Sequence, residues 1–157
     1  MKTFLIGLLA CAVLSSPASA TQTTSDLQQL GPYHLGASYD SLKTLSGFKL
    51  DETRTNPAEN IVAAKIIDKS VANTMTIQRF TFKNGRLIRI SIIFHPPDTW
   101  TEDAVKAWLV PQWGDPGVKE LCDSKDSPRC YAWRAPKSLG VILPADGGRH
   151  MASLMEL

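Results

Sequence analysis

The chain has 157 residues, of which 43% are hydrophobic, and it carries 17 Lys and Arg against 15 Asp and Glu. The formal net charge of +2 excludes the strongly basic composition with which nucleic-acid-binding domains hold phosphates. The length and the apolar content indicate one domain with a core of its own rather than a disordered chain.

Residues 1–20 have the composition of an export signal. Lys2 precedes an uncharged apolar run over residues 4–14, and Ala18 and Ala20 form a small-residue cleavage site. Cleavage after Ala20 predicts a periplasmic or secreted protein. Loss of Lys2 lowers the 17 basic residues to 16 against 15 acidic ones, a net charge of +1.

The apolar segment allows two alternative interpretations. Residues 8–11 (Leu-Leu-Ala-Cys) resemble a lipobox, so a lipoprotein anchored at Cys11 stays open. A transmembrane helix needs about 20 apolar residues, roughly twice the length of this run. No later stretch reaches that length, so we expect no transmembrane segment in the mature chain.

The first half of the mature chain predicts a helix followed by three strands. Residues 21–32 are polar and predict a flexible lead-in. Ser38 is the expected N-cap of a helix that ends at Gly47. Alternating β-branched and aromatic residues then predict strands over residues 61–68, 75–82 and 87–94.

The register of the last two strands follows from the apolar pattern around Asn84-Gly85. A two-residue turn alone would place Phe80 opposite Arg89, an aromatic against a cation on the core face. A three-residue loop over residues 83–85 with a glycine bulge is therefore expected. It puts Phe80 and Phe82 on one face with Ile88, Ile90, Ile92 and Phe94, and places Arg79 directly opposite Arg89.

The second half repeats this order. A capping box of Thr99 and Glu102 predicts a helix to about residue 109. Short apolar segments over residues 130–134, 139–143 and 150–157 predict three more strands. The expected fold class is α+β: an antiparallel sheet with two helices packed on one face, in the order helix-βββ-helix-βββ. We expect one domain over residues 33–157, with residues 33–94 and 99–157 as halves of a possible tandem repeat.

Two cysteines remain after removal of the signal. Cys122 and Cys130 flank a polar, loop-like segment, and an even pair in an oxidising compartment predicts a disulfide. On a chain-entropy model a loop of this size contributes about 2.6 kcal/mol. A redox-active pair or a zinc site is less well supported by the spacing.

This layout resembles the fold shared by beta-lactamase-inhibitor proteins and SmpA-type small outer-membrane assembly lipoproteins. The matching motif is Gly-x-Ser followed by a Leu-rich helix that ends in Gly. Its residues here are Gly36, Ser38, Leu42, Leu45 and Gly47, and the second half offers Leu109 and the Gly114-Asp115-Pro116 sequence. The resemblance implies a non-catalytic scaffold that binds another component of the cell envelope.

The candidate binding surface combines cations and tryptophans. Cations gather on the outward face and tip of the predicted hairpin, either as a solvated face that resists aggregation or as a docking face for an anionic partner. Trp100 and Trp113 lie at helix ends, where they either staple the helix or anchor a partner. The basic members are Lys65, Arg79, Lys83, Arg86 and Arg89.

We expect no catalytic residues, no metal site and no cofactor. The residues lack a nucleophile motif, and His34, His95 and His150 lack metal-ligand spacing. The leading hypothesis is an exported, non-enzymatic protein-binding module, such as an inhibitor or an envelope-assembly accessory. The alternatives are a periplasmic protein that binds an anionic ligand or lipid, and a small envelope hydrolase that uses His95 or His150 beside a carboxylate.

Overall fold

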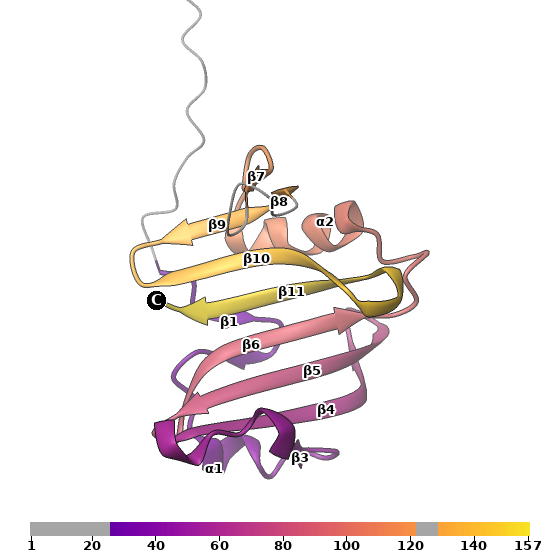
Figure 1. Ribbon diagram of the computed structural model, residues 1–157. Coiled ribbons are helices and arrows are strands. Elements are labelled where there is room, and N and C mark those ends of the chain that lie inside the picture. The colour runs from indigo at the N-terminus through magenta and orange to yellow at the C-terminus, as the bar shows by residue number, and fades with distance from the viewer. Residues whose placement is uncertain (1–25, 122–128) are drawn as a thin grey trace, which may run out of the picture.

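The computed structural model describes residues 26–121 and 129–157, which build one long antiparallel sheet with helices on one side (Figure 1). The sheet has seven strands in the order β3-β4-β5-β6-β11-β10-β9. Along the chain these are β3 (Lys49–Leu50), β4 (Ile61–Val71), β5 (Thr74–Lys83), β6 (Arg86–Phe94), β9 (Ala132–Ala135), β10 (Ser138–Ala145) and β11 (Arg149–Glu156).

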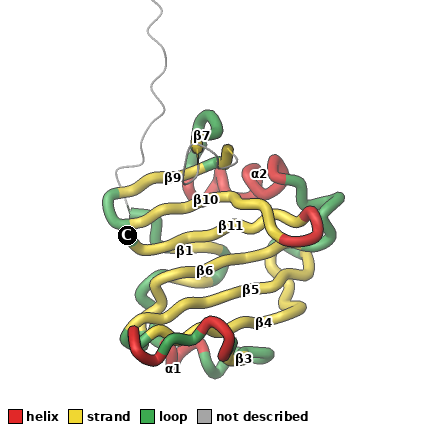
Figure 2. The backbone as a smooth tube through the Cα atoms, in the orientation of Figure 1, coloured by secondary structure: helices red, strands yellow, loops and turns green. Residues whose placement is uncertain are grey.

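Shorter elements connect these strands, as the tube in Figure 2 shows. The helices are α1 (Tyr39–Leu42) and α2 (Glu102–Trp113), and single 3₁₀ turns occur at η1 (Glu52–Arg54), η2 (Pro57–Glu59) and η3 (Asp146–Gly148). Two small hairpins pair β1 (Gln29–Leu30) with β2 (Tyr33–His34), and β7 (Glu120–Leu121) with β8 (Arg129–Cys130).

The antiparallel sheet with two helices is confirmed, whereas the element order is more complex than expected. The strands β1 and β2 precede α1, β3 precedes β4, and β7 and β8 precede β9. The six longer strands nevertheless form two consecutive meanders, β4-β5-β6 and β9-β10-β11, which meet where β6 pairs with β11.

Both helices cover the same face of the sheet, and alternation along the strands explains why. Phe80 and Phe82 on β5 and Ile90 on β6 are buried and point to this face. Tyr39 of α1 meets Phe82 edge-on at 5.3 Å, and Trp108 of α2 meets Phe94 of β6 at 5.2 Å. We call this side the covered face and the opposite side the open face.

The β5–β6 hairpin differs from the expected loop. Asn84 and Gly85 both have positive φ and form a two-residue turn, with Lys83 paired to Arg86. A bulge then leaves Ile88 without an opposite residue, so that Phe80 faces Ile90. The bulge restores the apolar pairing that a two-residue turn alone would break, and Phe80, Phe82, Ile90, Ile92 and Phe94 share a face as predicted. Ile88, predicted for the same face, is instead the bulged residue, and the buried Leu87 lies opposite Phe82.

The helix boundaries were predicted in part, and the expected end of the first helix at Gly47 was wrong because α1 ends at Leu42. Ser38 is the N-cap of α1, since its hydroxyl accepts from the Ser41 amide at 3.1 Å. The prediction of Thr99 as the second N-cap was wrong: Thr101 accepts from the Ala104 amide at 3.3 Å. The helix α2 also continues through Pro111.

The expected flexible lead-in packs against the sheet from Asp26 onward. Leu27 and Leu30 belong to the hydrophobic cluster of the covered face, and the Leu27 amide donates to the Ser138 hydroxyl at 2.8 Å. Residues 21–25 lie outside the described residues.

A buried polar contact lies within the covered face. The Tyr33 hydroxyl donates to the Gln78 side-chain carbonyl, and the Gln78 amide donates to the Thr76 hydroxyl at 2.9 Å. Burial raises the pKa of Tyr33 to about 12, so its hydroxyl keeps its proton. The buried Gln78 side chain has its hydrogen-bond partners only in the observed register of β5, so these bonds oppose a shift of the strand.

Trp113 joins three parts of the covered face. Its indole N–H donates to the Gln29 carbonyl at 2.7 Å, and its ring meets Trp133 edge-on at 5.3 Å. The ring also lies on Gly140, where an added Cβ would come within 2.6 Å of a ring carbon. Glycine is required there because α2 and β1 approach β10 through this ring.

We predict that Gly140→Ala lowers the free energy of unfolding by about 1–3 kcal/mol, because the new methyl group collides with the Trp113 ring. Chemical denaturation would measure it. The cause is tested in the Trp113→Leu variant. In that background Gly140→Ala should lower the free energy of unfolding much less, because the ring is absent. Equal losses in both backgrounds would contradict the proposed collision.

Candidate functional site

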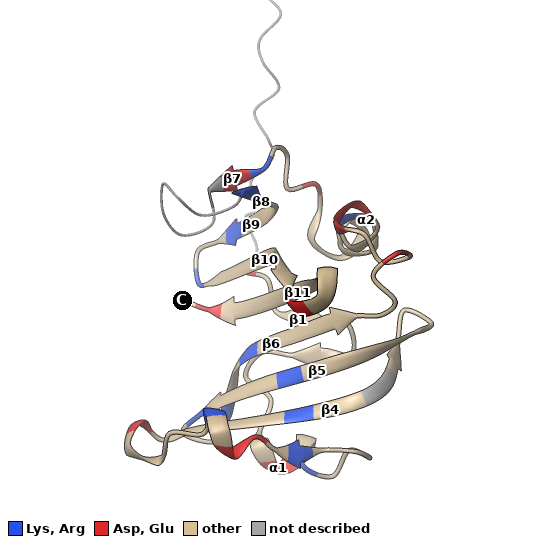
Figure 3. Ribbon diagram, turned by 45° about the vertical axis from the view of Figure 1, so that its right-hand side comes forward, with Lys and Arg blue, Asp and Glu red and all other residues tan. Residues whose placement is uncertain are grey.

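A row of cations crosses the open face. Lys49 on β3 lies opposite Lys65 on β4, and Lys65 lies opposite Arg79 on β5. Directly opposed side chains have Cβ atoms about 4.5–5.5 Å apart. In Figure 3 the blue segments on β4 and β5 lie side by side. We call Lys49, Lys65 and Arg79 the basic row.

Hydroxyl groups continue the row across the next two strands. Ser91 on β6 faces Arg79 on one side and Ser153 on β11 on the other. The two serine hydroxyls are 2.9 Å apart and buried. Arg89, one row away, donates from Nε to the Ser153 hydroxyl at 3.2 Å. This hydrogen bond therefore fixes the Arg89 side chain against the open face of the sheet.

Arg79 is the member of the basic row on β5. Its side chain is half-buried, and among the described residues no carboxylate lies within ion-pair distance of it. Burial lowers the pKa of its guanidinium and Arg54 lowers it further, whereas the charges of Asp51 and Asp146 raise it. A half-buried charge beside like charges is unfavourable, so this position suits an external anion.

Lys65 is only weakly neutralised. Its Nζ is 4.0 Å from Asp51 Oδ2, at the limit of an ion pair. Asp51 instead accepts a hydrogen bond from the Thr53 hydroxyl at 2.7 Å. That hydrogen bond is the main cause that lowers the pKa of Asp51, and Lys65 lowers it less. Asp51 therefore stays ionised beside the basic row without cancelling it.

The structure separates the sequence-predicted cations. Lys65, Arg79 and Arg89 share the open face, but Arg79 faces Ser91 and not Arg89 as predicted, because the two-residue turn and the bulge at Ile88 together shift the pairing by two residues. Lys83 and Arg86 form the exposed hairpin tip. Arg86 is paired there with Glu156 at 3.2 Å, so its charge is compensated.

The tryptophans lie on the other side of the sheet. Trp100 stacks on Phe94 at 4.6 Å and is partly buried, and Trp113 is buried against Gly140. Both side chains pack on the covered face, so the predicted surface of cations and tryptophans does not form. A large aromatic ring gains more free energy when it packs against the sheet than when it stays exposed to solvent.

The histidines considered for hydrolysis have other neighbours. His95 Nε2 lies 2.9 Å from an Arg149 guanidinium nitrogen, and His150 Nδ1 lies 3.2 Å from the Trp100 carbonyl. Within residues 26–121 and 129–157, no group of three or more His, Cys, Asp and Glu side chains is arranged to hold a metal ion.

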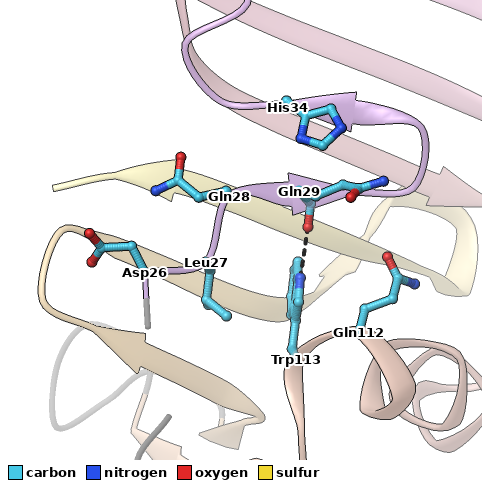
Figure 4. Close-up of a pocket in the computed structure, with 7 residues that line it drawn as sticks. All are labelled: Asp26, Leu27, Gln28, Gln29, His34, Gln112 and Trp113. Atoms are coloured by element: carbon cyan, nitrogen blue, oxygen red, sulfur yellow. Dashed lines mark hydrogen bonds between the residues drawn. The ribbon is translucent and has the colours of Figure 1, made fainter. Parts of the chain in front are cut away.

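Three cavities have linings that include no member of the basic row. One of about 280 Å³ is formed by β1, β2 and the end of α2, where His34 and Gln112 join Trp113 (Figure 4). A second, of about 460 Å³, lies at the hairpin tip between Lys83 and Leu157. The third, of about 500 Å³, has a mainly apolar lining and includes Tyr39, Leu50 and Val62.

Sequence reasoning missed Lys49 and the serine pair. Lys49 lies in a two-residue strand that shows no alternation, and Ser91 and Ser153 meet only because β6 pairs with β11. Cys122 lies outside the described residues, and Cys130 is buried at the end of β8. Their disulfide therefore stays a prediction.

Comparisons with protein-family models, curated proteins and solved structures gave no match. In the described part of the chain, no helix combines the length and apolar character that a membrane crossing requires. The function is therefore inferred from the residues of the open face.

We predict that Arg79→Met raises the free energy of unfolding by about 0.2–1 kcal/mol at low ionic strength, because it removes a half-buried charge from a row of like charges. The gain should shrink as salt is added. Thermal and chemical denaturation would measure both effects.

Arg134→Met is the matched control, because Arg134 lies in the same sheet but is paired with Glu120 at 2.9 Å. That variant should be neutral or slightly destabilising. A clear loss of stability in Arg79→Met would show instead that the guanidinium has a structural role.

Proposed function

We propose that this chain is an exported, non-catalytic binding protein that docks an acidic surface of a partner protein on its open face. The observation that supports this most directly is the basic row, with Arg79 half-buried and without an ion pair among the described residues. Cations kept at a cost to stability are typical of a binding surface. The partner would contribute the missing carboxylates.

A partner protein fits this face better than a small anion does. Small ligands are held in concave pockets that bury most of their surface. None of the three cavities described above includes a member of the basic row. The row instead extends across three neighbouring strands. An extended contact area of this kind is typical of an interface with another protein.

A second candidate is an anionic lipid, in line with the alternative of an anionic envelope component. One apolar row runs beside the basic row, from Ile67 through Ile77 and the buried Ile93 to Met151, and its exposed part lies at the β4 end. Ile67 is about half exposed, at 48%. Cations beside an apolar band suit a lipid with a charged head group.

The export signal, the disulfide and the repeat complete the proposal. Removal of residues 1–20 would release the protein into the periplasm or the medium, and anchoring at Cys11 is the alternative. In that compartment Cys122 and Cys130 would pair. The two meanders that meet at β6 and β11 support descent from a duplicated helix-βββ unit.

We predict that the protein captures a partner from an envelope extract and that capture depends on the basic row. The double variant Lys65→Gln plus Arg79→Met should bind the captured partner at least about tenfold more weakly, because two charge contacts are lost. Added salt should weaken binding by the wild type. Surface plasmon resonance with the purified partner would measure the affinities.

The matched control is Arg129→Met plus Lys137→Gln, which removes the same charges from exposed positions outside the open face. It should bind like the wild type. Equal capture by both double variants, or no partner at micromolar concentration, would contradict the proposed function.

We also predict that the mature protein begins at Thr21 and that its unreduced mass is lower by two hydrogens because of the disulfide. Intact mass spectrometry before and after reduction would test both points. A lipid-modified N-terminal Cys11 would contradict release. A mass unchanged by reduction would contradict the disulfide.

A further inference from the structure

The edge of the sheet next to the basic row carries an apolar cavity. Leu50 follows Lys49 in the edge strand β3 and lines a cavity of about 500 Å³. Tyr39 from α1 and Val62 from β4 form other parts of the wall, together with Thr55 and Pro57. The volume lies within the range of about 300–1,000 Å³ that is typical of ligand pockets.

The aromatic and polar side chains that line this cavity already have partners within the protein, so the interior of the cavity is mainly apolar. Tyr39 packs edge-on against Phe48 at 5.8 Å and Phe82 at 5.3 Å, which fixes its ring. The Thr55 hydroxyl accepts from the Ala63 amide at 3.1 Å and donates to the Asp51 carbonyl at 3.0 Å. Thr55 therefore has little remaining polar capacity for a ligand.

Leu50 is exposed at 52%, so it adds accessible apolar surface at the edge of the cavity. Exposed apolar surface at a concave site is typical of a place where a partner buries its own apolar group. A single bulky side chain that enters such a pocket is the usual centre of a protein interface.

The cavity and the basic row lie on opposite sides of the sheet and meet at its β3 edge, because Leu50 pairs with Ala64 of the covered face whereas Lys49 pairs with Lys65 of the open face. Lys49 precedes Leu50, and Asp51, which follows it, lies 4.0 Å from Lys65. A partner segment that wraps around the β3 edge would meet the cavity on the covered side and the cations on the open side. Glu52 is the one charged side chain among the cavity-lining residues, and it would repel carboxylates from the cavity and leave them for the row.

Resting on the proposed function, we infer that the partner presents an acidic segment with one bulky apolar side chain, aromatic or Leu-like, which enters the cavity of Tyr39, Leu50 and Val62. The carboxylates of the segment bind Lys49, Lys65 and Arg79. The apolar side chain contributes affinity, and the carboxylates contribute association rate and orientation.

The test is selection of displayed random peptides on four folded proteins in parallel. These are the wild type, Leu50→Asp, the Lys65→Gln plus Arg79→Met variant, and Val118→Asp. Val118 is exposed at 87% and lies outside the cavity, so it controls for the added charge. Circular dichroism would confirm that each variant is folded.

Peptides enriched on the wild type should combine Asp or Glu with a large apolar residue. Their synthetic forms should bind Leu50→Asp at least about tenfold more weakly, and Val118→Asp like the wild type. Replacing the apolar residue of the peptide with Ala should cause a similar loss.

Two other outcomes separate the hypotheses. Peptides that lose affinity for the Lys65→Gln plus Arg79→Met variant but bind Leu50→Asp normally would overturn the cavity inference and leave the proposed function intact. Peptides that bind all four proteins equally, or a selection that enriches none, would count against the proposed function itself.

Discussion

Side chains alternate along β5, and this alternation divides the sheet into two chemically different faces. Gln78, Phe80 and Phe82 point to the covered face, whereas Arg79 between them points to the open face. Because β5 is paired on both sides, each of its residues has neighbours on β4 and β6. The core and the basic row therefore depend on the same register, and a slip of one residue would exchange them.

The covered face explains why the register is stable. Aromatic rings from both helices meet Phe82 and Phe94, and Trp113 rests on Gly140 where any larger residue would collide. The Tyr33 hydroxyl bonds to Gln78 within this apolar layer. A slipped strand would lose that hydrogen bond and expose rings, so burial on one face maintains the cations in their places on the other.

On the open face, charge repulsion destabilises the fold, in contrast to the stabilising packing of the covered face. The positive charges of Lys65 and Arg79 lie side by side and are only partly neutralised by carboxylates. Their repulsion lowers the free energy of unfolding, and packing of the covered face offsets this loss. A partner that brings carboxylates would remove this cost, because ion pairs shielded from water replace like-charge repulsion. An apolar side chain in the cavity beside Leu50 would add affinity that charge alone does not give.

The sequence by itself determined the local features that short-range physics controls. The N-cap at Ser38, the strands of both meanders, and the shared face of Phe80, Phe82 and Ile90 follow from spacing alone. Only the tertiary structure decided which distant residues meet. The Lys49 pairing, the serine pair of β6 and β11, and the burial of Trp100 and Trp113 depend on strand order and packing. Periodicity states which way a side chain points, whereas its neighbours depend on how the whole chain closes around the core.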